Sequence, residues 1–271
     1  MRVQWVGAIF SLFLFSSESL AQSSEPAPFP EFTFRSVTPP ARGDTAPRIN
    51  IQIVPQADIA PSSVPPQLDA PPVAQDVAWF WSEVPDAITG GAIRFQLALA
   101  HLADAPEAAS LGVARADDLG QMAAEYGASI LAATIGTRVS PALVLAVMAV
   151  ESAGQPDAES IAGAQGLMQL IPATAERFGV TDSFDPSQNI AGGVAYLDWL
   201  MDEFDRDPVL VLAAYNAGEG AIRSADGVPE FAETRRYVPK VLATWQLARL
   251  LCLTPPELIW DGCVFRTMTG G

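Results

Sequence analysis

The sequence of residues 140–151 is Ser-Pro-Ala-Leu-Val-Leu-Ala-Val-Met-Ala-Val-Glu. Serine followed by proline is typical of a helix start, because serine caps free N–H groups and proline suits the first turn. The apolar residues 142–150 predict a helix buried on nearly all sides. At its end, Glu151 shares a face with Val147 and Met148. We therefore expect a carboxyl group beside hydrocarbon, at the negative end of a helix dipole.

Both surroundings disfavour the ionised form of Glu151 and so are expected to raise its pKa. A glutamic acid that keeps its proton near neutral pH is what a general acid requires. The alternative is a glutamate that reaches solvent as its helix ends. The sequence around Glu151 is needed to distinguish a general acid from a solvent-exposed glutamate.

Downstream, Gly154-Gln155-Pro156 is expected to stop this helix. The segment 163–169, Gly-Ala-Gln-Gly-Leu-Met-Gln, has two glycines in four residues and predicts a β-hairpin or loop that lines a cleft. Further helices are expected from Pro172, from Asp185-Pro186, from Asp207-Pro208 and from Glu233 through Trp245. Upstream, apolar spacing predicts helices over 92–103 and 116–133.

Composition excludes several kinds of chemistry. The chain has 271 residues, 31 acidic and 15 basic, with a formal net charge of −16, so we expect no nucleic-acid partner. The single histidine, His101, stands away from any cluster and is expected to be a packing or surface residue. No histidine-rich metal site and no P-loop is available, and we expect no metal and no cofactor.

The N-terminus predicts export. Arg2, the apolar run 5–15 and the small residues around Ala21 are typical of a cleaved signal peptide over 1–21. An uncleaved membrane anchor is the alternative. Residues 22–75 are expected to be a disordered, Pro-rich linker, because 13 of the 23 prolines lie between Pro26 and Pro85. A protein-docking segment is the other interpretation.

The chain has two cysteines, Cys252 and Cys263. In an exported protein such a pair most simply forms a disulfide, which here holds the C-terminal tail against the body. Two thiols alone are too few for a metal site.

Four motifs in order resemble the soluble-lytic-transglycosylase (SLT) family, lysozyme-like enzymes that cleave bacterial peptidoglycan. The motifs are Glu151-Ser152, Gly166-Leu167-Met168-Gln169, Ala214-Tyr215-Asn216-Ala217-Gly218, and Glu233-Thr234 with Tyr237-Val238. The resemblance covers about residues 138–248. It implies a mainly α, lysozyme-like domain in which a short β-hairpin or loop lines the cleft, preceded by the linker.

The resemblance assigns a role to each matching position. Glu151 matches the catalytic acid/base, and Ser160 a serine that contacts the sugar next to the cleaved bond. The remaining matches are substrate-cleft residues: Gln169, Tyr215, Asn216, Glu233 and Tyr237. Simpler alternatives are a turn serine at 160, a core tyrosine at 215 and a glutamate at 233 that only satisfies its helix dipole.

The implied reaction cleaves the MurNAc–GlcNAc β-1,4 bond and leaves a 1,6-anhydromuramic end, without a cofactor. Two alternatives remain: a hydrolytic muramidase of the same fold, or a non-catalytic scaffold that binds glycan or assists secretion. The expected partners are peptidoglycan strands and cell-wall or secretion-system proteins. We expect an exported, periplasmic monomer. Its predicted parts are 1–21 signal peptide, 22–75 linker, 76–137 helical extension packed on the catalytic domain, 138–250 SLT domain, and 251–271 tail.

Overall fold

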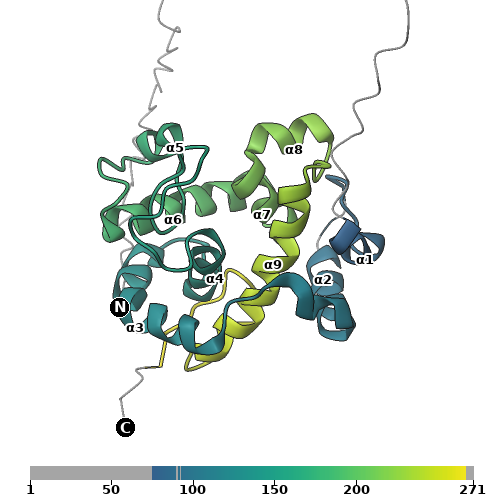
Figure 1. Ribbon diagram of the computed structural model, residues 1–271, viewed down its shortest axis with the longest axis horizontal. Helices are drawn as coiled ribbons and strands as arrows, with labels where there is room; N and C mark the ends of the chain where they lie inside the picture. Colours follow the sequence, from purple (N-terminus) through teal and green to yellow (C-terminus); the bar gives the residue numbers. More distant parts are fainter. Residues whose placement is uncertain (1–74, 90, 92, 267–271) are drawn as a thin grey trace, which may run out of the picture. The chain divides into compact units, whose positions relative to one another are not determined.

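The computed structural model describes residues 75–89, 91 and 93–266. The predicted signal peptide and all but the last residue of the predicted linker lie outside this range. Within it, the secondary structure is helical and no strand is present. The mainly α fold class is confirmed, and its lysozyme-like character stays a prediction. The α-helices, shown in Figure 1, are α1 (Ala78–Glu83), α2 (Ile93–Asp104), α3 (Ala116–Thr134), α4 (Pro141–Glu151), α5 (Pro172–Arg177), α6 (Pro186–Glu203), α7 (Pro208–Ala217), α8 (Glu219–Ala225) and α9 (Ala232–Ala248).

Helix α4 forms the centre of the core. Residues 141–149 are all buried, and α4 packs against α3 and α9. Ser140 takes the N-cap position, but its side chain makes no capping hydrogen bond, in contrast to the sequence-based expectation. Its hydroxyl is buried, and its backbone N–H donates to the Ile259 carbonyl at 2.9 Å. The predicted helix start is confirmed, and the predicted side-chain cap is wrong: the Ser140 hydroxyl is buried without a hydrogen bond among the described residues.

The aspartates of the two Asp-Pro pairs do cap their helices. Asp185 accepts from the Gln188 N–H at the start of α6, and Asp207 accepts from the Val209 and Leu210 N–H groups at the start of α7. Helix α9 continues past Trp245 to Ala248 and contains Pro239. Because proline has no N–H, it cannot bond the carbonyl of Arg235.

That carbonyl is used to attach α1. The Trp81 indole N–H donates to the Arg235 carbonyl oxygen at 2.9 Å, and the Arg235 guanidinium lies 4.8 Å from the Trp81 ring centre. Arg235 is buried and also pairs with Asp86 and Glu230. His101 packs against the Trp79 ring and bonds its carbonyl, a structural position as expected. These contacts attach α1 to α9 and α2 to α1.

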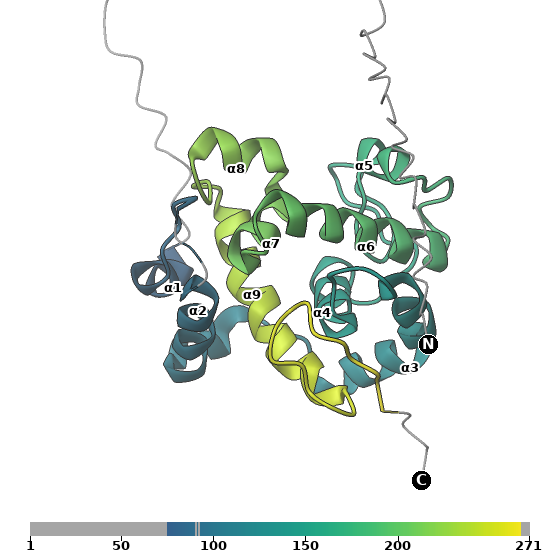
Figure 2. The same ribbon diagram turned by 180° about the vertical axis from the view of Figure 1, so that it is seen from behind.

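Seen from the back, the chain after α9 turns across α4 towards α3 (Figure 2). It includes the 3-10 turn Arg249–Leu251 and the disulfide Cys252–Cys263, which is formed as predicted. Within the described range, no helix has both the length and the apolar character that crossing a bilayer requires.

The segment between α4 and α5 is a loop. The pairs Glu159–Gln165 and Gln165–Leu170 are isolated bridges, so of the two predicted forms, β-hairpin or loop, the described chain adopts the loop. Positive φ angles at Gly163, Gly166 and Gln169 interrupt extended backbone and prevent a regular ladder.

Candidate active site

Glu151 is the last residue of α4 and lies in a cavity of about 1020 Å³. Burial raises the pKa of its carboxyl from 4.5 to about 7. The Tyr237 hydroxyl and the positive charge of Lys240 oppose this rise, and the negative charge of Glu233 adds to it. A group whose pKa lies near neutral pH is able both to give and to take a proton.

The same cavity contains every predicted site residue. Its lining includes Glu151, Ser160, Gln169, Tyr215, Asn216, Glu233 and Tyr237. The structure therefore brings together positions that are up to 86 residues apart in the chain, from Glu151 to Glu233 and Tyr237. Their roles toward a substrate stay predictions.

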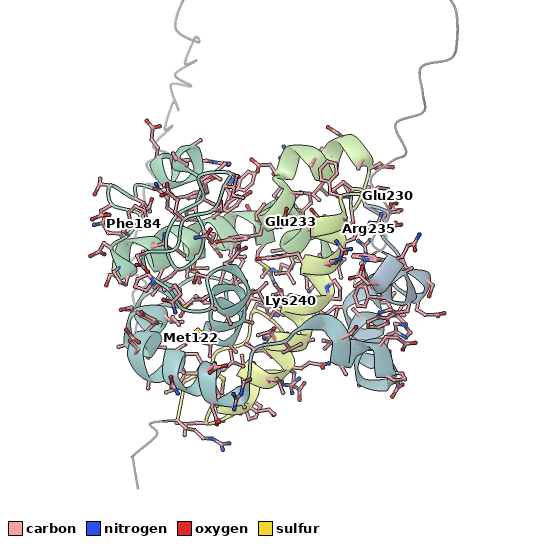
Figure 3. The ribbon with its side chains drawn as sticks, in the orientation of Figure 1. Met122, Phe184, Glu230, Glu233, Arg235 and Lys240 are labelled. Carbon is pink, nitrogen blue, oxygen red and sulfur yellow. A yellow bond between two sulfur atoms is a disulfide. The ribbon has the colours of Figure 1, made fainter. Side chains whose placement is uncertain are left out.

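One face of α9 provides three polar groups. Glu233, Tyr237 and Lys240 follow one another at spacings of four and three residues, which places them on one side of the helix. Figure 3 shows Glu233 and Lys240 on the side of α9 towards α4, whereas Arg235 and Glu230 lie towards α1. The Tyr237 hydroxyl is buried without a hydrogen bond of standard geometry among the described residues. Burial, followed by the nearby Glu151 charge, raises its pKa well above the usual value.

The loop after α4 is fixed by buried hydrogen bonds. The Ser152 hydroxyl donates to the Leu167 carbonyl at 2.7 Å, which ties the end of α4 to the motif 166–169. The side chain of Asn189, fully buried in α6, accepts from the Met168 N–H at 2.7 Å and donates to the Gln165 and Ser183 carbonyls. This part of the cleft wall is therefore held by its own core contacts.

Two of the predicted contact residues also stabilise that loop. The Ser160 hydroxyl accepts from the Ala164 N–H at 3.0 Å, which leaves its proton available to a ligand. Gln169 has φ +49°, and its amide NH₂ donates to the Ala158 and Gly166 carbonyls. Its side-chain oxygen remains available as an acceptor.

The opposite wall comes from the end of α7. The Tyr215 hydroxyl is buried and donates to the Met168 carbonyl at 2.8 Å, so this group is committed to the protein. Its ring still lines the cavity. The Asn216 side-chain oxygen accepts from the Thr234 hydroxyl at 2.7 Å, and its NH₂ lies 3.5 Å from the Glu233 carboxylate. Asn216 thus joins α7 to the first turn of α9.

A second cavity, of about 760 Å³, adjoins the first. Both are lined by Val150, Glu151, Ser160, Gln169 and Lys240. The second continues along α3 and is lined there by Asp118, Met122 and Glu125. The two cavities therefore form one cleft with Glu151 at the junction. In this position, an acid can reach a bond in the interior of a bound polymer.

Lys240 and Asn189 were not identified from the sequence. Lys240 follows Tyr237 at helical spacing, and that spacing was an available signal. Asn189 precedes Ile190 in the apolar stripe of α6, where a polar residue indicates a buried hydrogen-bonding role. Within the described ranges, no three side chains suited to a metal ion come together.

Comparison with known proteins gives matches over much of this cleft. Residues 128–238 match the model described as the transglycosylase SLT domain. The transglycosylase of Enterobacteria phage PRD1 is 39% identical over 120 residues, which are 44% of this chain and 43% of the phage protein. The soluble lytic murein transglycosylase of Salmonella typhimurium is 34% identical over 134 residues, which are 41% of this chain and 21% of that protein.

A similar solved structure is that of the 70 kDa soluble lytic transglycosylase from Escherichia coli. It has 30% identity and a TM-score of 0.45, and the match covers 49% of this chain and 25% of that one. The chain spans less than half the length of the two curated relatives above.

The cleft belongs to a helical domain with a glutamic acid at its centre. Residues 128–238 match a transglycosylase SLT domain, so the resemblance to the soluble-lytic-transglycosylase family predicted from the sequence is confirmed over this segment. The match begins within α3, ahead of the predicted boundary at residue 138. The predicted domain boundaries stay predictions.

Proposed function

We propose that this protein is a lytic transglycosylase that cleaves the β-1,4 bond between N-acetylmuramic acid and N-acetylglucosamine in peptidoglycan. The observation that carries the proposal is a glutamic acid with a pKa of about 7 at the junction of a two-part cleft, within an SLT domain. Because the cleft continues on both sides of Glu151, a glycan strand can extend past the acid in both directions.

In the first step, the Glu151 carboxyl donates its proton to the oxygen that links the two sugars. The bond between this oxygen and C1 of the muramic residue breaks, and the GlcNAc side leaves as an alcohol. The 2-acetamido oxygen of the same muramic residue can stabilise the electron-poor C1, so a second catalytic carboxylate is not required.

In the second step, the C6 hydroxyl of that sugar attacks C1 and closes the 1,6-anhydro ring. Its proton returns to the Glu151 carboxylate, which restores the starting state, and no water is consumed. A carboxyl whose pKa lies near the working pH suits both transfers. Ser160, Gln169, Asn216 and Glu233 supply polar groups along the cleft for the sugars.

The experiment is digestion of purified peptidoglycan followed by mass analysis of the fragments. We expect ends that are one water lighter than hydrolytic ends from the wild type, and no release from Glu151→Gln. The matched control is Glu176→Gln, an exposed glutamate of α5 outside both cavities, which is expected to behave as wild type. Hydrated ends would instead show a muramidase, and no release by the wild type would indicate a glycan-binding scaffold; either result would overturn the proposal.

We also infer that the protein acts outside the cytoplasm, in the periplasm. The disulfide Cys252–Cys263 is compatible with an oxidising compartment, and peptidoglycan lies outside the inner membrane. A mature chain that begins near Gln22 in the periplasmic fraction would support this localisation. The uncleaved form in the membrane fraction would contradict it.

A further inference from the structure

The only lysine of the chain, Lys240, is at the centre of the cleft. It lies on α9, one turn after Tyr237, and lines both cavities at their junction with Glu151. The side chain is partly buried and close enough to Glu151 for its charge to act on that carboxyl. A strand bound in the cleft would pass beside this ammonium group.

Lys240 has no anionic partner within the described part of the chain: it takes part in no ion pair and no side-chain hydrogen bond there. The other cation that lines the cleft, Arg236, is paired with Asp76 at 2.7 Å. The carboxyl groups around the cleft come from α3, α4, α9, the loop 152–171 and the turn before α1: Asp118, Glu125, Glu151, Glu233, Glu159 and Asp76. In this acidic cleft, the unpaired ammonium group of Lys240 is therefore suited to bind an anionic group of a ligand.

The negative charges of a peptidoglycan strand are carboxylates attached to its muramic acid residues. The sugar rings and their acetamido groups are neutral, and the carboxylates are on the 3-O-lactyl arm of N-acetylmuramic acid or in the stem peptide attached to it. If Glu151 protonates the bond at C1 of this sugar, the arm is attached to the same ring as the bond that breaks. It therefore enters the cleft near Glu151, where Lys240 also lies.

We propose that Lys240 binds a carboxylate carried on the lactyl arm of the muramic residue at the cleaved bond, and so sets the register of the strand. The inference rests on the proposed function, because it takes Glu151 as the acid. Lysine suits this role as a compact point charge on a flexible stem, which can follow either the carboxylate of a bare arm or one in a stem peptide. An uncharged GlcNAc polymer lacks this interaction.

The test compares four proteins, the wild type, Lys240→Gln, Lys240→Arg and Arg206→Gln, on four soluble glycan substrates. Arg206 is exposed and outside both cavities, so its variant controls for the change in net charge. The substrates are peptide-bearing strands, strands stripped by an amidase, and both kinds after their carboxylates are converted to methylamides. Anhydro ends are counted to obtain kcat and KM, at pH 5 where Glu151 is protonated in all four proteins.

We expect Lys240→Gln to raise KM about tenfold on strands with free carboxylates and less than twofold on amidated strands, the usual size of a charge-assisted contact. Lys240→Arg should keep most of the affinity. A loss confined to stripped strands identifies the carboxylate of the lactyl arm itself, and a loss confined to peptide-bearing strands identifies one in the stem. Both results support the proposal.

An equal loss on free and amidated strands would overturn it. Lys240 would then act only through Glu151, and the pH profile of kcat/KM would move with the substitution. This failure is distinct from failure of the proposed function, in which the wild type itself produces no anhydro ends on any strand.

Discussion

The acid at residue 151 is costly to the folded protein for the same reason that it is useful. Burial at the end of α4 raises the pKa of Glu151 from 4.5 to about 7. Between these two pH values the folded protein holds a proton that the unfolded chain has released. The free energy of unfolding therefore falls as pH rises through this interval and stays low above it.

Glutamine at 151 has no charge to bury and does not titrate. We expect Glu151→Gln to increase the free energy of unfolding by up to about 3 kcal/mol at pH 8, because each unit of pKa shift corresponds to about 1.4 kcal/mol. At pH 4, where the carboxyl is mostly protonated in both states, the difference should be small. Urea unfolding at both pH values measures this, with Glu176→Gln as a control. A stability gain of equal size at pH 4 and pH 8 would show that the charge of Glu151 is not the cause.

At the scale of one element, the loop 152–171 shows why the motif Gly166-Leu167-Met168-Gln169 contains its glycine. Gly166 has φ +76°, and a Cβ there would lie 2.1 Å from the Ser183 carbonyl and 2.4 Å from the Asn189 side-chain nitrogen. Gly163, in the same loop, has φ +80° but no atom within 4 Å of its Cβ position. A substitution at Gly163 therefore tests backbone strain alone, and one at Gly166 tests backbone strain together with steric contact.

We expect Gly163→Ala to lower stability by about 1 kcal/mol, the usual cost of an L-residue at positive φ. Gly166→Ala should cost about 3 kcal/mol or more, because its Cβ also displaces the buried Asn189 that holds Met168. Thermal unfolding of both variants, together with their rates of glycan cleavage, provides the comparison. Similar losses in the two variants would mean that the loop relaxes around residue 166 and that the close contact is unimportant.

Local signals explain what was predictable in these elements. Helices α4 to α7 begin at prolines, and α2 and α3 follow apolar spacing, so their positions could be predicted from short windows. The short helices α1 and α8 were missed. Helix α1 is stabilised by the contact of Trp81 with Arg235, which is far away in the sequence. The predicted catalytic and substrate-contact residues all line one cavity, whereas their roles stay predictions. The hydrogen bond from Tyr215 to Met168, and Lys240 at the junction, depend on how α7, α9 and the loop pack, which no single segment encodes.

At the scale of the whole described molecule, a buried ion pair connects the extension to the core of the SLT domain. Arg94 of α2 is fully buried, and its Nε lies 3.5 Å from the Asp207 carboxylate, the cap of α7. Arg94 also donates to the Ala87 carbonyl, whereas its Nε and Nη1 have no hydrogen bond within the described residues. Burial raises the pKa of Asp207, and the charge of Arg94 opposes this rise. The pair is therefore held by the attraction of opposite charges, which opposes the cost of burying them, and not by a hydrogen bond between the two side chains.

Removal of one partner should cost more than removal of both. We expect Arg94→Met to lower the free energy of unfolding by about 3 kcal/mol, because it leaves a buried carboxylate without its counter-ion. Adding Asp207→Asn should restore part of this loss, since asparagine still caps α7 and has no charge to bury. If α2 folds as one unit with the SLT domain, urea unfolding monitored by tryptophan fluorescence and by far-UV circular dichroism will give coincident transitions in all variants. Two separate transitions, with only the first moved by Arg94→Met, would instead make residues 76–137 an independent module and would place the ion pair at a boundary between domains.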